Sequence, residues 1–280
     1  MKKWFAVIGD PVAQSMSPGM HDYWFKENKI DATYLPVHAK SEKLQSVISS
    51  LKLLGCSGWN VTVPHKSDIL PFLGSVDEAA AHMDAVNTVV IEGDGALVGY
   101  NTDGIGFVHA LEEKYGNDRK KEEILIIGAG GAAKGIAFAL RSAGYGSITF
   151  TNRTMTNAYE LSKRLSNSTC LPIAEAELQL ARFGIIIQTT SVGMAFSTEG
   201  MPLDPSNAAP GTATVDIIYN PLETEFLAAA RNSGAATANG IGMFVHQGAL
   251  AFEKWTGIHP DTAGMMEQLT QQLEDQHDNK

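Results

Sequence analysis

The stretch ILIIGAGGAA, residues 124–133, decides how the rest of the chain is interpreted. Its first four residues form an unbroken apolar run, which is typical of a strand buried on both faces of a parallel sheet. The second half fits the pattern G-x-G-x-x-G/A, with Ala133 in the third place. Such a turn brings the backbone and a helix N-terminus against a pyrophosphate. Because a strand precedes this turn and a helix follows it, the stretch predicts a dinucleotide site rather than a mere glycine-rich turn.

Strands and helices alternate downstream of this stretch. We expect strands at 147–151, 169–173, 184–189, 213–218 and 236–239, and helices at 131–143, 154–165, 176–182 and 224–232. This alternation is the βαβ rhythm of a doubly wound sheet, and it predicts a Rossmann-type domain.

The first hundred residues alternate in the same way and end in a hairpin. We expect strands at 4–8, 32–37, 59–63, 87–91 and 96–100, and helices beginning at Ser17-Pro18 and over 41–54, 75–83 and 104–115. After Gly240 the pattern is helical through Trp255 and again near 261–275. The sequence therefore predicts an α/β protein of two α/β domains, with a boundary near residues 101–121.

Composition narrows the class of protein and of partner. The chain has 280 residues, 44% of them hydrophobic, and a formal net charge of -10. This charge argues against nucleic acid and against an anionic membrane as partners, and no apolar run reaches membrane length. Cys56 and Cys170 lack any metal-ligand spacing, so we expect no metal site and a reducing, cytoplasmic compartment. The sequence leaves the association state open, and a homodimer is one option.

The end of the expected strand 147–151 distinguishes between dinucleotides. NAD sites place an acidic residue there to bind the ribose 2′-hydroxyl, but this chain has none before Glu160. It has Arg153 between Asn152 and Thr154, and a guanidinium suits the 2′-phosphate of NADP. Thr154 as a helix N-cap beside a solvent-facing arginine is the structural alternative, and both interpretations can hold together. We favour NADP.

Hydride exchange with a carbonyl requires a proton donor or acceptor near the oxygen. A lysine beside a carboxylate can fill this role, and Lys66 and Asp103 are the candidate pair, each next to a strand or hairpin end. Asp103 is also a good N-cap for the helix expected after it, and Ser17 is a good N-cap for the first helix. We interpret the histidines as structural or surface residues, and Met243 as core or pocket wall.

A series of short motifs follows one order along the chain. They are Ser15-Met16-Ser17-Pro18, Asn60 to Lys66, Ala85 to Thr88, Asn101 to Gly104, Gly128 to Ala132, Asn152 to Thr154, Asp216 to Pro221, and Gly240 with Gly242 to Gln247. Together they resemble the shikimate dehydrogenase family over nearly the whole chain. Phe244 replaces the family's usual leucine, which is a conservative change.

The resemblance implies a reversible NADPH-dependent reduction of 3-dehydroshikimate to shikimate, a step of chorismate and aromatic amino-acid biosynthesis. It implies Lys66 and Asp103 as the catalytic pair and a substrate site of Ser15, Ser17, Thr62, Lys66, Asn87, Asp103, Tyr219 and Gln247. It implies a cofactor site of Glu78, Gly128, Ala129, Gly130, Gly131, Ala132, Asn152, Arg153, Thr154, Met155, Thr156, Asn157, Ile217 and Gly240.

The resemblance also implies that the chain leaves the substrate domain and returns to it. Residues 1–102 and 240–280 would form the substrate domain, and residues 103–239 the NADP-binding domain. A quinate/shikimate dehydrogenase is the alternative within the enzyme class. A non-catalytic NADP-sensing module on the same fold is the alternative outside it, since fold alone does not fix function.

Overall fold

The computed structural model describes residues 2–195 and 197–278, and the chain divides into two compact units. The first comprises Met1–Asp103 and Val245–Met265, and the second comprises Gly104–Phe244 and Met266–Lys280. The first cut lies one residue beyond the expected boundary at residue 102. The chain returns to the first unit at Val245, where the resemblance implies residue 240, and residues 266–280 group with the second unit. Among the residues described, no helix is long and apolar enough to cross a membrane.

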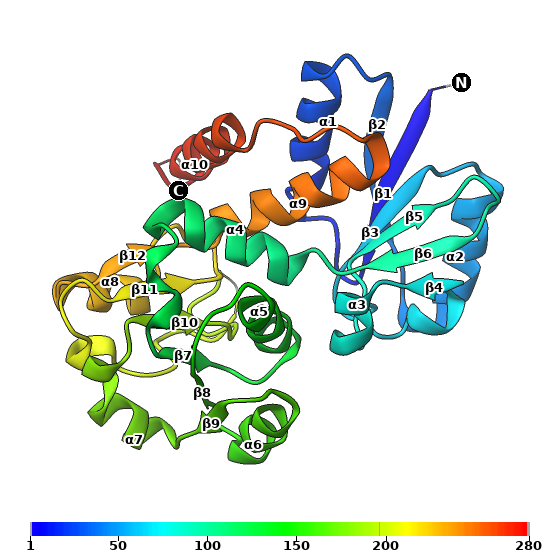
Figure 1. Ribbon diagram of the computed structural model, residues 1–280. Helices are drawn as coiled ribbons and strands as arrows, with labels where there is room; N and C mark the ends of the chain where they lie inside the picture. Colours follow the sequence, from blue (N-terminus) through cyan, green and yellow to red (C-terminus); the bar gives the residue numbers. More distant parts are fainter. Residues whose placement is uncertain (1, 196, 279–280) are drawn as a thin grey trace. The chain divides into compact units, whose positions relative to one another are not determined.

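The first unit is built on a mixed six-stranded sheet with strand order β2-β1-β3-β5-β6-β4 (Figure 1). Its elements are β1 (Lys3–Gly9), α1 (Ser17–Glu27), β2 (Ala32–His38), α2 (Leu44–Leu53), β3 (Gly58–Val61), β4 (Ser75–Val76), α3 (Glu78–Met83), β5 (Thr88–Ile91) and β6 (Leu97–Tyr100). β1 pairs in parallel with β2 and β3, and β5 runs antiparallel to β3 and β6. The ends of β1 and β3 and the start of β5 therefore meet at one edge of the sheet.

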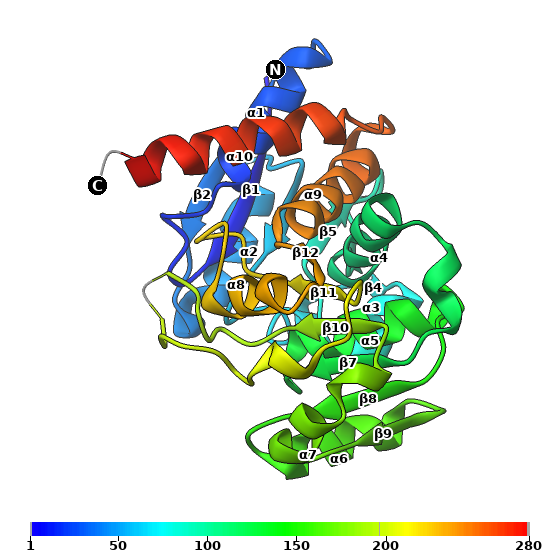
Figure 2. The same ribbon diagram turned by 90° about the vertical axis from the view of Figure 1, so that its left-hand side faces the viewer.

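The second unit holds a six-stranded sheet that is parallel throughout, with strand order β12-β11-β10-β7-β8-β9. Its elements are α4 (Asp103–Tyr115), β7 (Ile124–Ile127), α5 (Gly131–Ser142), β8 (Ile148–Thr151), α6 (Met155–Arg164), β9 (Ser168–Cys170), α7 (Ile173–Leu178), β10 (Ile185–Gln188), β11 (Ala213–Asp216), α8 (Glu225–Asn232) and β12 (Ala236–Ala238). α6 packs along β8 and β9 (Figure 2). The strand order reverses between β7 and β10, which is the Rossmann switch point where ligands bind.

β7 shows why its sequence is apolar without alternation. Ile124 and Ile126 pack in one core cluster with Ile136 of α5, whereas Leu125 and Phe226 of α8 belong to the cluster on the other side. All four residues of the strand are buried. The expected Rossmann-type domain is therefore confirmed, with its core divided by the central strand.

Two helices complete the chain: α9 (Ile241–Thr256) and α10 (Thr262–Asp278). The part of α9 that belongs to the first unit contributes Phe252 and Trp255 to an aromatic cluster around His21. The His21 ring stacks on Tyr34 with centroids 4.4 Å apart. It is fully buried, and neither ring nitrogen has a hydrogen-bond partner among the described residues. Burial lowers the pKa of His21 to about 3, so the ring is neutral at physiological pH.

Local structure departs from the sequence expectations at several places. The helix expected over 176–182 is replaced by α7, which ends at Leu178, and by a short 3-10 turn over Leu180–Arg182. Ser17 begins α1 but does not cap it, because Met16 holds the N-cap position and the Ser15 hydroxyl accepts the Ser17 N–H at 3.3 Å. The strand expected over 169–173 ends at Cys170, since Pro172 lacks an N–H for the ladder. The helix expected over 75–83 begins only at Glu78, after the short strand β4 pairs with β6.

Candidate functional site

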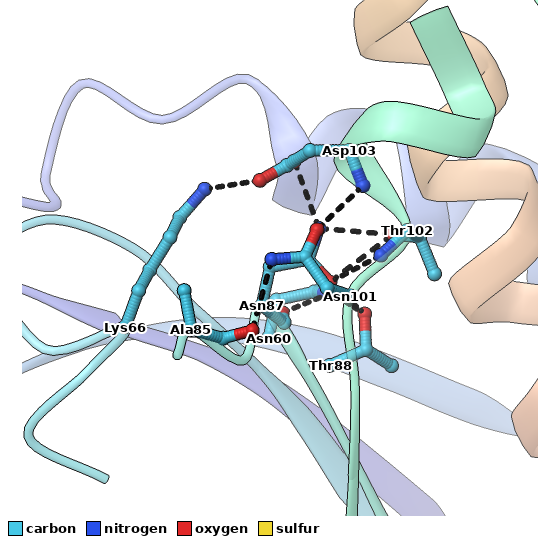
Figure 3. Close-up of polar contacts among 8 residues, drawn as sticks. All are labelled: Asn60, Lys66, Ala85, Asn87, Thr88, Asn101, Thr102 and Asp103. Atoms are coloured by element: carbon cyan, nitrogen blue, oxygen red, sulfur yellow. Dashed lines mark hydrogen bonds and ion pairs between the residues drawn. The ribbon is translucent and has the colours of Figure 1, made fainter. Parts of the chain in front are cut away.

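Lys66 lies in a tight turn after β3. The Thr62 N–H donates to the Ile8 carbonyl at 2.9 Å, and the His65 N–H donates back to the Thr62 carbonyl at 2.9 Å. The Lys66 carbonyl accepts the Val86 N–H at 2.7 Å, which ties the turn to the segment before β5. These backbone bonds fix the position from which the lysine side chain extends (Figure 3).

The Lys66 ammonium meets the Asp103 carboxylate. Lys66 Nζ lies 2.6 Å from Asp103 Oδ2, and the Asn87 amide donates to Asp103 Oδ1 at 2.8 Å. Both carboxylate oxygens are thus occupied, while the lysine and aspartate side chains remain 32% and 19% exposed. An amine oriented by a carboxylate and still open to a ligand is suited to proton transfer. Asp103 begins α4, and its own N–H donates to Asn101 Oδ1 at 3.1 Å.

The structure places the other predicted substrate residues in both units. Thr62 directly follows β3 and is half-buried, and Ser15 and Ser17 lie at the start of α1. Gln247 is half-buried in the part of α9 that belongs to the first unit. Tyr219 belongs to the second unit, where its ring contacts Phe244 and burial raises the pKa of its hydroxyl.

The glycine loop in the second unit has the shape that a pyrophosphate requires. Gly128 adopts φ +117°, and a Cβ there would overlap the Thr189 hydroxyl. Gly130 and Gly131 face open space, since nothing lies within 4 Å of a Cβ built on either. Gly130 is the N-cap residue of α5 and has no side chain that could occupy the N–H groups of the helix N-terminus. The first helical turn holds no acidic residue that would repel an anion. The residues present therefore fit the diphosphate of a dinucleotide.

The segment after β8 carries the predicted nucleotide-specificity residues. The Asn152 amide donates to the Thr154 carbonyl at 2.9 Å, which shapes the turn into α6. Thr154 is the N-cap residue, but its side chain makes no capping hydrogen bond. Arg153 is exposed and makes no hydrogen bond or ion pair among the described residues. Met155, Thr156 and Asn157 form the first turn of α6.

The segment after β11 is held by a buried acid. Asp216 accepts hydrogen bonds from the Ile218 N–H at 3.0 Å and from the Thr224 hydroxyl at 2.8 Å. Burial raises the pKa of its carboxyl to about 6, against the effect of these two bonds. Gly240 packs against this segment so closely that a Cβ would overlap the Ile217 carbonyl oxygen. Ile217 and Gly240 thus form one contact at the carboxyl ends of β11 and β12.

Glu78 is the predicted cofactor residue that belongs to the first unit. It lies in the first turn of α3 in the first unit, its side chain is 91% exposed, and it lies 3.6 Å from His82. Ala129 and Ala132, in contrast, belong to the glycine loop itself. Among the described residues, no cluster of three or more His, Cys, Asp or Glu could hold a metal ion.

The sequence analysis did not single out Thr189, which follows β10. The Thr189 hydroxyl donates to the Ile127 carbonyl at 2.7 Å and lies directly against Gly128. Since β10 adjoins β7 at the switch point, the rule for open parallel sheets would have found this segment once the strand order was known.

Comparisons with known proteins match segments in both units of the chain. Family models match residues 7–89 (shikimate dehydrogenase substrate binding domain), 110–219 (shikimate/quinate 5-dehydrogenase) and 240–270 (shikimate 5′-dehydrogenase C-terminal domain). The chain is 52% identical to a shikimate dehydrogenase (NADP(+)) of Lysinibacillus sphaericus, over 98% of this chain and 99% of that protein.

Solved structures agree over the same length. A crystal structure of a shikimate dehydrogenase with NADP+ matches with a TM-score of 0.90 at 37% identity, covering 97% of this chain and 96% of that one. A Thermus thermophilus enzyme with NADP(H) and shikimate matches with a TM-score of 0.86 at 35% identity, covering 95% and 97%. On the family models and on an identity above one half over almost its entire length, the chain belongs to the shikimate dehydrogenase family.

Proposed function

We propose that the chain catalyses the reversible reduction of 3-dehydroshikimate to shikimate with NADPH, in chorismate and aromatic amino-acid biosynthesis. The observation that carries this proposal is the ion pair of Lys66 and Asp103, with Nζ and Oδ2 2.6 Å apart and both side chains partly open. Relatives that carry the name shikimate dehydrogenase (NADP(+)) support it.

Lys66 moves the proton in this proposal. During reduction its ammonium gives a proton to the C3 oxygen of the substrate, and during oxidation its amine takes the proton back. Asp103 orients the amine and accepts a hydrogen bond from Asn87 on its other oxygen. Ser15, Ser17, Thr62, Tyr219 and Gln247 bind the carboxylate and hydroxyls of the substrate. Asn87, which the resemblance also assigns to the substrate site, contributes through Asp103, because its buried amide already bonds to protein partners. Bound NADPH supplies the hydride.

The second unit supplies the cofactor site. The backbone from Gly128 to Ala133 and the free N–H groups of α5 hold the diphosphate, and residues 152–157 hold the adenosine ribose. Ile217 and Gly240 line the remainder of the site. Glu78, in the first unit, stays a prediction from the family resemblance. We assign residues 1–102 with 240–280 to substrate and residues 103–239 to NADP.

Arg153 provides the test of cofactor choice. We expect Arg153→Ala to raise KM for NADP+ by roughly tenfold to a hundredfold, the value of a lost charge-assisted hydrogen bond. KM for NAD+ should stay the same, because NAD+ has no 2′-phosphate. Initial rates with both cofactors measure this, with exposed Arg231→Ala as control. An equal loss with NADP+ and NAD+ would remove Arg153 from phosphate recognition.

Gly9 provides a test of the substrate ligand Thr62. A Cβ on Gly9 would overlap Thr62 Cγ2, so Gly9→Ala must displace that side chain. We expect KM for shikimate to rise roughly tenfold, which corresponds to about 1.4 kcal/mol of binding, with KM for NADP+ unchanged. Gly93→Ala is the control, since a Cβ there meets nothing within 4 Å. An unchanged KM for shikimate would contradict the role of Thr62.

Quinate is the alternative substrate to shikimate. The family model over residues 110–219 covers both shikimate and quinate enzymes, and quinate differs by a hydroxyl at C1. Comparing kcat/KM for the two substrates with each cofactor decides between them. Preference for quinate with NAD+ would overturn the proposal, and binding of NADPH without turnover of either substrate would indicate a sensing module.

We also propose a cytoplasmic homodimer. Cys56 and Cys170 are both free thiols, as a reducing compartment allows. Leu53 and Leu54 are 87% and 69% exposed and offer apolar surface that a second copy would cover. Light scattering tests this: the dimer has twice the 30.0 kDa of one chain, and a mass of 30.0 kDa would contradict it.

A further inference from the structure

The Asn87 side chain uses its full hydrogen-bonding capacity. Its amide nitrogen donates to Thr102 Oγ1 at 2.9 Å and to Asp103 Oδ1 at 2.8 Å. Its amide oxygen accepts from the Thr102 N–H and from the Thr88 hydroxyl, each at 2.9 Å, while the Thr102 hydroxyl lies farther from it, at 3.2 Å. A primary amide offers two donors and one oxygen with two lone pairs. The plane of this amide, and with it the N–H directed at Asp103, is therefore fixed (Figure 3).

The Thr88 hydroxyl has only one direction in which to donate. Asn60 Nδ2 lies 3.0 Å from Thr88 Oγ1 and can only donate, so Thr88 must accept there and give its single proton to Asn87 Oδ1. The Asn60 amide cannot turn over, because the same nitrogen donates to the Asn87 carbonyl at 3.0 Å. Its oxygen accepts the Tyr34 hydroxyl at 2.6 Å.

The residues of this hydrogen-bond chain are buried, which makes each bond costly to lose. Tyr34, Thr88, Asn87 and Asn60 are 1%, 0%, 3% and 8% exposed, so water has little access to replace a missing partner. A buried polar group that loses its partner pays the full cost of desolvation. The orientation set at Tyr34 is thus passed through Asn60 and Thr88 to Asn87, and ends on the carboxylate that holds Lys66.

We infer that Thr88 is a positioning residue for this reaction, with Asn60 and Tyr34 behind it, and that it acts through Asn87 on the Asp103 carboxylate. None of the three needs to touch substrate for this effect. The inference rests on the proposed function, because it assigns a role to these residues in the proton transfer at Lys66.

The test replaces the hydroxyl and keeps the shape. We expect Thr88→Val to lower kcat for shikimate oxidation by about tenfold, which corresponds to about 1.4 kcal/mol in the barrier, with KM for NADP+ unchanged. Thr88→Ser should recover most of the lost kcat, because serine keeps the hydroxyl. Thr214→Val is the matched control: Thr214 is a fully buried strand residue whose hydroxyl has no partner among the described residues.

Tyr34→Phe is the second variant, and it tests the same chain of hydrogen bonds even if Thr88→Val does not fold. It should lower kcat by less than Thr88→Val does. In the double variant the two losses should not add, because both act through the same chain of bonds. Thermal unfolding of every variant is measured alongside.

Each outcome decides the inference. Wild-type kcat in Thr88→Val, a loss in Thr88→Ser equal to that in Thr88→Val, or additive losses in the double variant would each overturn it. Reduced kcat with recovery by serine and non-additive losses would support it. An inactive wild-type protein would instead refute the proposed function, so the two failures are distinct.

Discussion

Replacing Lys66 with alanine is expected to lower kcat for shikimate oxidation by about two to four orders of magnitude, the range of general acid–base catalysis. The variant loses the amine that, in this proposal, carries the proton to and from the substrate oxygen. We expect little change in KM, because the remaining ligands of the substrate stay in place. Steady-state rates at saturating shikimate and NADP+ measure this effect.

Two further lysine variants separate proton transfer from charge. Lys66→Arg keeps a cation beside Asp103, but a guanidinium does not release its proton, so its kcat should be as low as that of Lys66→Ala. Lys120→Ala is the matched control, since Lys120 forms an ion pair with Glu112 at 2.9 Å and is 35% exposed. Near-normal kcat in Lys66→Ala would remove Lys66 from the mechanism.

Acid should destabilise the chain through His21, and His21→Phe should lack this contribution. The pKa of His21 is lowered from 6.5 to about 3 in the folded chain, so between these values the unfolded chain binds the extra proton. The stability that neutral His21 provides is complete above pH 6.5 and is lost as the pH falls. The loss is about 1.4 kcal/mol per pH unit, or about 2.7 kcal/mol at pH 4.5.

Urea unfolding at several pH values measures this loss. The difference in the free energy of unfolding between His21→Phe and wild type should be constant above pH 7 and should widen below pH 6 in favour of the variant. In the wild type the ring centroids of His21 and Tyr34 are 4.4 Å apart, and a phenylalanine ring can keep this stacking. The substitution also removes two buried ring nitrogens that have no hydrogen-bond partner among the described residues. His82→Gln is the control, because the His82 side chain is 59% exposed. Parallel curves for His21→Phe and wild type down to pH 4.5 would contradict the buried neutral ring.

Sequence patterns predicted the second sheet well because its signals are local. The apolar run at β7 and the glycines after it require only one strand, one turn and one helix. The strand order is not local, and this is why Thr189 was missed. Its hydroxyl meets Gly128 only because β10 returns to pair with β7.

The sequence could predict Lys66 and Asp103 as the candidate pair, but it could not predict the hydrogen bonds that surround them. Lys66 and Asp103 each follow a recognisable element, so the sequence could nominate them. The bonds that run from Tyr34 through Asn60 to Thr88 join residues 26 and 28 positions apart. No periodicity encodes such contacts, and Asn60 alone resembles an ordinary strand residue. Their directions follow from counting the donors and acceptors of each buried side chain.

The central claim is that this chain oxidises shikimate with NADP+ through Lys66. The most direct measurement is the absorbance of NADPH formed when purified protein meets shikimate and NADP+, for wild type and Lys66→Ala side by side. We predict rapid formation of NADPH by the wild type and a rate lower by about two to four orders of magnitude in the variant. No NADPH from the wild type, or equal rates from both proteins, would contradict the account.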